Sequence, residues 1–158
     1  MFPIYSQLDA MDCGPTCLRM VAKHYGVGLS AQGLREASEI GKDGVNLLGI
    51  AQAAEHYGFR TLGVKVSISK LREDAPLPCI VHWGQNHFVV VYKISKSKVW
   101  VADPARGLLQ YTVTEFESQW ATTRTDGVAT GVALLLEPTP ALYEQESFDE
   151  KKKSQGFG

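Results

Sequence analysis

The chain has 158 residues, of which 44% are hydrophobic, and a formal net charge of −1. This length supports one packed core and one domain. Without an excess of positive charge there is no basic stripe for a phosphate backbone, so we do not expect nucleic acid as a partner. No apolar run is long enough to cross a bilayer, and MFPIYSQLD lacks the features of a signal peptide. Three cysteines, an odd number, favour reduced thiols in a cytosolic setting.

The first half of the chain is predicted to be helical. A first helix has Pro15 at its first position, carries apolar residues at helical spacing, and ends at Gly26. A second, shorter helix follows Ser30, which can cap it. A third helix is capped by Asn46 and ends at Gly58.

After Gly58 the sequence pattern changes to short β-branched and aromatic runs separated by turn residues. Expected strands are RTLGVKV, PCIVHW, HFVVVYKI, VWVAD, LLQYTV and GVALLLEP, with helical turns at SISKLRE and TEFESQWA. Two connections, 84–86 and 95–98, are short enough for antiparallel hairpins. Helices followed by a mainly antiparallel sheet predict an α+β fold for residues 1–137. Residues 138–158 are polar and charged, and we expect a linker or tail there.

The stretch QLDAMDCGPTCLRM places Cys13 where the first helix begins. A helix N-terminus favours an anion, so a thiol held there becomes a nucleophilic thiolate more readily. The alternative is a buried small hydrophobe. Asp12 is expected to satisfy free backbone N–H groups at the same helix end. Cys17 and Cys79 are interpreted as core residues, and because paired metal-ligand spacings are absent we expect neither a metal nor a cofactor.

Among the four histidines, His87 is the best candidate for a general base. His24 and His56 lie near helix ends, where a cation favours the dipole, and His82 lies inside a strand pattern. His87 follows the turn GQN and opens the most apolar strand, so it stands at the mouth of a rigid element. A structural role for a lone histidine remains the alternative.

Asp103 and Gln7 complete the candidate set. Asp103 ends the strand that returns from the hairpin begun by His87, but symmetric pairing sets it near Val90, so contact with His87 requires a bulge, twist or irregular pairing. The alternative is that Asp103 only starts a turn before Pro104. The Gln7 amide can donate to a developing oxyanion, with the Cys13 backbone N–H as second donor, although most glutamines are simply solvated.

The segments QLDAMDCGPTCLRMVAKHYG, HWGQNHFVVVYKI and VADPARG together resemble the double-glycine leader peptidase domain of bacterial peptidase-containing ABC transporters, the bacteriocin-processing cysteine endopeptidases. The resemblance covers most of residues 1 to about 137. It implies a papain-like fold with an N-terminal helical lobe and a C-terminal antiparallel sheet lobe. It also implies Cys13 as nucleophile, His87 as general base, Asp103 as orienting acid and Gln7 as oxyanion donor.

For partners, the resemblance implies a precursor peptide whose amphipathic helical leader is cut after Gly-Gly or Gly-Ala. It further implies the transmembrane and ATP-binding domains of an ABC transporter, at the inner face of the bacterial cytoplasmic membrane. This sequence contains neither a membrane span nor a G-x-x-x-x-G-K-[ST] loop, so we expect an excised portion of a transporter or a stand-alone peptidase.

Two other functions compete with a peptidase. Related transporters carry a non-catalytic docking module that has lost the cysteine and only holds the export substrate. The joint presence of Cys13, His87 and Asp103 argues against that reading. A thiol redox enzyme would favour Cys-x-x-Cys, whereas this chain has Cys-x-x-x-Cys.

Overall fold

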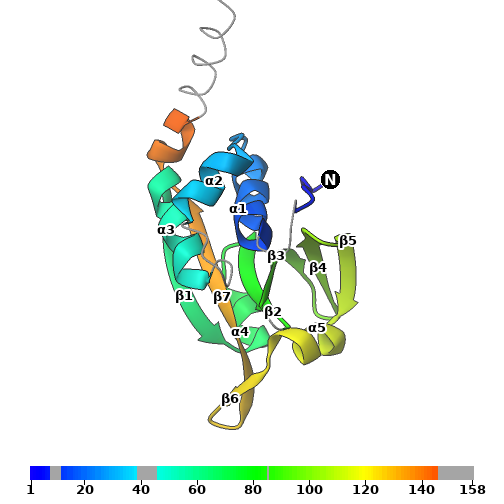
Figure 1. Ribbon diagram of the computed structural model, residues 1–158. Coiled ribbons are helices and arrows are strands. Elements are labelled where there is room, and N and C mark those ends of the chain that lie inside the picture. Colours follow the sequence, from blue (N-terminus) through cyan, green and yellow to red (C-terminus); the bar gives the residue numbers. More distant parts are fainter. Residues whose placement is uncertain (8–11, 39–45, 85, 146–158) are drawn as a thin grey trace, which may run out of the picture.

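A computed structural model describes residues 1–7, 12–38, 46–84 and 86–145. Three helices come first, α1 (Cys13–His24), α2 (Ala31–Ala37) and α3 (Leu47–Tyr57). The remaining elements are β1 (Phe59–Val66), α4 (Ile68–Asp74), β2 (Cys79–Trp83), β3 (His87–Ile94), β4 (Lys98–Asp103), β5 (Gly107–Thr112), α5 (Val113–Trp120), β6 (Thr123–Thr125) and β7 (Val128–Pro138). This order, helices and then a sheet, confirms the predicted α+β class (Figure 1).

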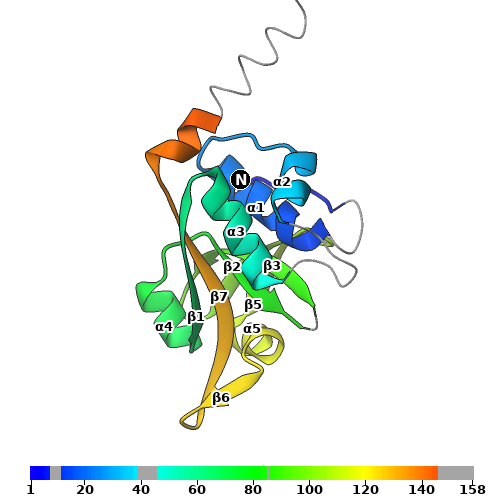
Figure 2. The same ribbon diagram turned by 60° about the vertical axis from the view of Figure 1, so that its left-hand side comes forward.

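The described strands form a sheet in the order β1-β7-β2-β3-β4-β5, with β6 paired to β7, and each pairing is antiparallel. Helices α1 to α3 gather on one side of the sheet, while α4 and α5 pack on a second apolar cluster (Figures 1 and 2). Side chains alternate along β3, where Phe88 and Val90 join the cluster under α1, and Val89 and Val91 join the cluster under α5. The central strands are therefore apolar on both faces.

Local signals set the helix ends in the way the sequence predicts. The Ser30 side chain accepts a hydrogen bond from Gly33 N at 3.0 Å, and Asn46 accepts one from Gly49 N at 2.8 Å. Gly58 ends α3 with φ +112°, a left-handed conformation that favours glycine. Helix α1 differs slightly, because it begins at Cys13 and Pro15 is its third residue. The missing N–H of proline is harmless there, since no first-turn N–H has an intrahelical acceptor.

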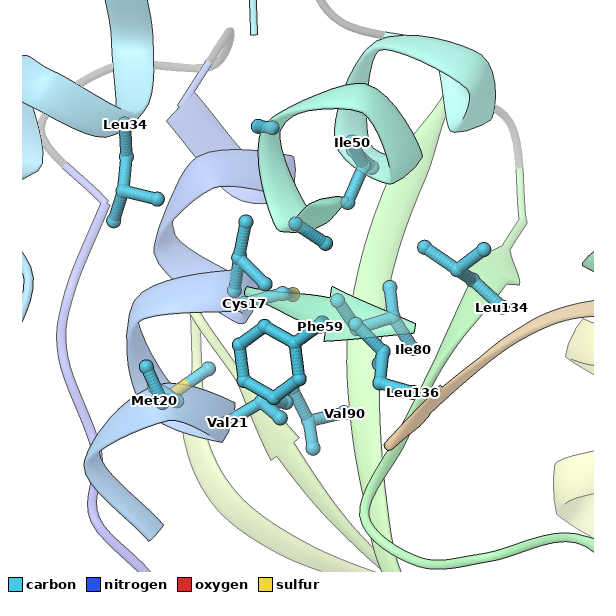
Figure 3. Packing of buried hydrophobic residues seen from close by; sticks show 14 of the residues in the cluster. Cys17, Met20, Val21, Leu34, Ile50, Phe59, Ile80, Val90, Leu134 and Leu136 are labelled. Atoms are coloured by element: carbon cyan, nitrogen blue, oxygen red, sulfur yellow. The ribbon is translucent and has the colours of Figure 1, made fainter. Parts of the chain in front are cut away.

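Helix α1 packs into the larger apolar cluster between the helices and the sheet. Figure 3 shows Cys17 and Val21 of α1 near Phe59, Ile80 and Val90 from three different strands. All five side chains are buried. This shared core fixes α1, and with it the helix start at Cys13, against the sheet.

Two features differ from the sequence prediction. Strand β6, of sequence TRT, forms a hairpin with the start of β7 across Asp126 and Gly127, both at positive φ, and the sequence prediction missed this threonine-rich strand and Asp-Gly turn. The polar stretch expected from 138 onward also has a structured beginning, because residues 140–145 are helical and Leu142 is fully buried in the core. The run Ala141, Leu142 and Tyr143 is too short to show an apolar period, so the sequence pattern did not reveal this packing.

None of the helices in the described residues combines the length and the apolar character that a bilayer crossing requires.

Candidate active site

Cys13 is the first residue of α1 and is 4% exposed. Helix α1 lies against β3, the strand that begins with His87 (Figure 1). The N–H groups of a first helical turn have no intrahelical acceptor, and the helix dipole favours negative charge at that end. The structure therefore puts the predicted nucleophile at an anion-stabilising helix end, beside the predicted base.

A β-bulge brings Asp103 to the same side of the hairpin as His87. Near the turn, Ile94 pairs with Val99, and that register alone would set Asp103 opposite Val90. The register shifts by one residue between Val91 and Lys93, so that Val90 pairs with Ala102 and, one step on, Asp103 faces Val89. Since Val89 and His87 share a face, the bulge changes the face on which the carboxylate emerges. This bulge confirms the prediction that contact between Asp103 and His87 requires irregular strand pairing.

His87 and Asp103 form a direct pair. His87 Nε2 lies 2.8 Å from Asp103 Oδ1, and the same oxygen accepts the Ala105 N–H at 2.8 Å. Asp103 therefore both starts the turn and contacts the histidine, so the two sequence interpretations are compatible. Burial works to raise the pKa of the Asp103 carboxyl, but the hydrogen bonds from His87 and Ala105 outweigh it and leave that pKa below its usual value.

His87 also hydrogen-bonds the Cys13 side chain. Because Nε2 faces Asp103, Nδ1 is the ring nitrogen left for the thiol. The Asp103 hydrogen bond, followed by the Cys13 hydrogen bond, raises the pKa of His87 to about 9 against the opposing effect of burial. The imidazole is thus held as a cation at neutral pH, between the Asp103 carboxylate and the Cys13 sulfur.

Gln7 lies beside the same turn. Its backbone N–H donates to Pro104 O at 3.0 Å, which places residue 7 next to the Asp103 segment. Upstream, the Phe2 ring stacks on Tyr92 at 4.6 Å between ring centroids, and Arg19 lies over the Tyr5 ring. These contacts hold the segment before α1, through Phe2 and Tyr5, against α1 and β3. The sequence prediction missed them, because isolated aromatic residues before a helix carry no periodic signal.

Asp12 does not cap α1, contrary to the sequence prediction. It occupies the N-cap position without a side-chain hydrogen bond to the helix, and its Oδ1 lies 2.9 Å from Arg35 Nε of α2. The physical reason is that Asp12 is 3% exposed, and a buried carboxylate requires a cation more than it requires a cap. Nothing local in the sequence identifies Arg35, since the contact depends on how α2 packs beside α1.

The remaining candidates have packing roles. Cys17 and Cys79 are fully buried, as predicted, and burial raises the pKa of Cys79 to about 12. His24 stacks on Phe2 and His82 meets the Phe88 ring edge-on. Within the described parts of the chain, no group of three or more His, Cys, Asp or Glu side chains could hold a metal ion.

A thiol in contact with an imidazole, with a carboxylate behind the ring, can perform nucleophilic acyl transfer. With the thiol on a helix start and the imidazole on the sheet, this chain falls in the papain-like class of cysteine peptidases. The profile of the Peptidase C39 family matches residues 1–140, and the chain belongs to that family.

Known relatives agree with this placement. The Lactococcin-G-processing and transport ATP-binding protein LagD of Lactococcus lactis subsp. lactis is 38% identical over 143 residues, covering 87% of this chain and 19% of LagD. The chain thus spans about a fifth of that relative. A crystal structure of a double glycine motif protease from an AMS/PCAT transporter with its leader peptide matches at TM-score 0.77 and 30% identity, covering 87% of this chain and 91% of the other. The peptidase domain of Streptococcus ComA matches at TM-score 0.76 and 33% identity, covering 88% and 100%.

Proposed function

We propose that this domain removes the leader from a precursor peptide by cutting after a Gly-Gly or Gly-Ala pair. The observation that carries the proposal is the chain of contacts from Cys13 through His87 to Asp103, with 2.8 Å between the last two side chains. Membership of the Peptidase C39 family and the likeness to a double glycine motif protease with bound leader peptide support the substrate class.

In the proposed mechanism, the Cys13 thiolate attacks the carbonyl carbon of the residue before the scissile bond. The Gln7 amide and the Cys13 backbone N–H stabilise the oxyanion that forms. The His87 imidazolium gives its proton to the leaving amine, and the C–N bond breaks to leave a thioester on Cys13. Water then attacks the thioester and transfers its proton through His87, which releases the leader as a free acid. Asp103 keeps the imidazole oriented throughout.

The wider setting is part of the same proposal. LagD and ComA are named as transport and processing ATP-binding proteins, and this chain matches only a part of such relatives. We place the domain at the inner face of the bacterial cytoplasmic membrane, where it acts on an amphipathic helical leader before export. The segment 138–158 then links it to transmembrane and ATP-binding domains, with the first residues of that segment packed on the peptidase through Leu142.

The test is cleavage of a synthetic precursor peptide with a Gly-Gly leader, followed by mass spectrometry. The wild-type chain should release one leader fragment ending in Gly-Gly. Cys13→Ala should abolish cleavage while leaving the peptide bound, and Cys79→Ala serves as the matched control for loss of a buried thiol. A docking module would bind the peptide without cutting it, and iodoacetamide at neutral pH would then label Cys13 no faster than the other cysteines.

A further inference from the structure

The second cysteine of α1 connects the two halves of the site. Cys17 lies one helical turn after Cys13 and is fully buried (Figure 3). Its Sγ donates a hydrogen bond to the backbone oxygen of Phe88 at 3.3 Å. Phe88 directly follows His87, so a single contact joins the helix of the nucleophile to the strand of the base.

The charge state of Cys17 suits a donor. Burial, and then the negative charges of Cys13 and Asp103, raise the pKa of the Cys17 thiol well above its usual value. Cys17 therefore keeps its proton and remains a hydrogen-bond donor to Phe88. The two thiols of α1 have opposite tasks in the proposed mechanism, because Cys13 acts there as the nucleophile and Cys17 as the donor.

Apolar packing alone would leave the position of α1 less defined. Apart from the contact between Cys13 and His87 at the site itself, apolar side chains such as Leu18, Val21 and Val90 pack between α1 and the sheet. Hydrophobic contact is non-directional, so it holds a helix against a sheet without fixing a small slide or rotation. A hydrogen bond to a backbone oxygen is directional and opposes both motions.

We propose that Cys17 is a positioning residue, whose hydrogen bond to the Phe88 carbonyl fixes the distance between Cys13 and His87. The inference rests on the proposed roles of those two residues. A misplacement of about 1 Å between reacting groups can lower a rate by roughly 100-fold. Loss of the Cys17 contact should therefore lower the rate of the chemical step more than it weakens peptide binding.

The experiment compares Cys17→Ala with Cys79→Ala in cleavage of the Gly-Gly leader peptide. Both variants remove a fully buried thiol, but the structure gives a side-chain hydrogen bond only for Cys17 among these two. Relative to Cys79→Ala, Cys17→Ala should lower kcat by about tenfold or more, with KM changed less than about twofold. Cys17→Ser retains a donor and should recover most of kcat. Equal kcat values for the two alanine variants, measured where both are folded, would overturn the proposal.

A spectroscopic measurement covers the case in which the Cys17 variants fail to fold. In the Cys13→Ala, Cys79→Ala chain, Cys17 is the only thiol, because the sequence has three cysteines. Its infrared S–H stretching band should lie at a lower wavenumber than that of a thiol without an acceptor. A band at the acceptor-free position contradicts the proposal. Failure of the proposed function has a different signature, which is an uncut leader peptide with the wild-type chain.

Discussion

Two regions of the molecule, the site and the junction between α3 and β1, are held together by different sets of contacts. At the site, side chains from α1, β3 and β4 meet through short polar contacts, such as the 2.8 Å separation between His87 and Asp103. At the junction where α3 gives way to β1, the backbone of Leu142 packs against Gly58, and Gly58 O accepts the backbone N–H of Thr139. Hydrogen bonds between side chains set the geometry of the site, whereas close packing around a glycine, supported by hydrogen bonds to Gly58 O, sets that of the junction.

This difference separates the expected effects of substitution. A change that removes one polar contact at the site leaves the packed core in place, so it should lower activity and spare stability. A change at the α3–β1 junction disturbs packing far from the reacting atoms, so it should lower stability and spare activity. Four substitutions, two at the site and two at the junction, test this separation.

Asp103→Asn should have the largest effect. It leaves the shape of the side chain intact but weakens orientation of the imidazole, and we expect kcat to fall by about 10²- to 10⁴-fold without abolishing cleavage. The wild-type kcat/KM should decline as pH rises through about 9, since the imidazolium then loses its proton. Because Asp103 is the main cause of the raised pKa of His87, the variant should decline at a lower pH. A pH profile of kcat/KM measures both, and an unshifted alkaline limb would contradict the assignment.

Gln7→Ala should have the second largest effect on activity. If its amide is an oxyanion donor, the variant should raise the activation free energy by about 2.7–4 kcal/mol, seen as a loss of kcat. The backbone contact between Gln7 N and Pro104 O does not need the side chain, so the melting temperature should stay the same. Gln110→Ala, at an exposed position on β5, is the control. Unchanged turnover in Gln7→Ala would remove the proposed role.

Gly58→Ala should act on stability alone. Alanine is disfavoured at φ +112°, and its Cβ would collide with the backbone of Leu142. Together these should lower the free energy of unfolding by about 3 kcal/mol. Gly28→Ala is the matched control, since no atom lies within 4 Å of its added Cβ. Chemical denaturation and peptide cleavage measure the two quantities, and a large loss of kcat at a temperature where the variant is folded would break the separation.

Thr139→Val should have the smallest effect. The Thr139 hydroxyl donates to Gly58 O, which also accepts the Thr139 backbone N–H at 2.9 Å. Removing the hydroxyl should lower the free energy of unfolding by about 1 kcal/mol, with the backbone bond retained. Thr139→Ser keeps the donor and should be closer to wild type. Equal losses in both variants would show that the methyl group, and not the hydroxyl, matters there.

Structural features that depend on a few neighbouring residues, such as helix caps, could be predicted from the sequence. Ser30 and Asn46 cap their helices, and Gly58 ends α3, because each acts on backbone groups within four residues of itself. The strand runs were identified in the same way. The candidate site was identified by residue chemistry and by the family resemblance, and His87 does meet Asp103 as expected.

Features that depend on packing between distant segments could not be predicted. Asp12 was expected to cap α1, yet it pairs with Arg35 of another helix. Leu142 was assigned to a polar tail, yet it is buried on the core beside Gly58. In both cases the deciding partner lies far along the chain, and only the folded arrangement of helices and sheet brings it near. The same holds for the contact between Cys17 and Phe88.

The bulge in β3 also constrains how this hairpin can change in evolution. His87 and Asp103 are separated by 16 positions in the sequence. Their side chains meet only because the one-residue register shift between Val91 and Lys93 puts Asp103 on the same face of the sheet as His87. Deleting one strand residue would turn the carboxylate to the opposite side, whereas a change of two would restore it. Homologous sequences should therefore gain or lose strand residues here in pairs, and unpaired gaps should fall in the turn.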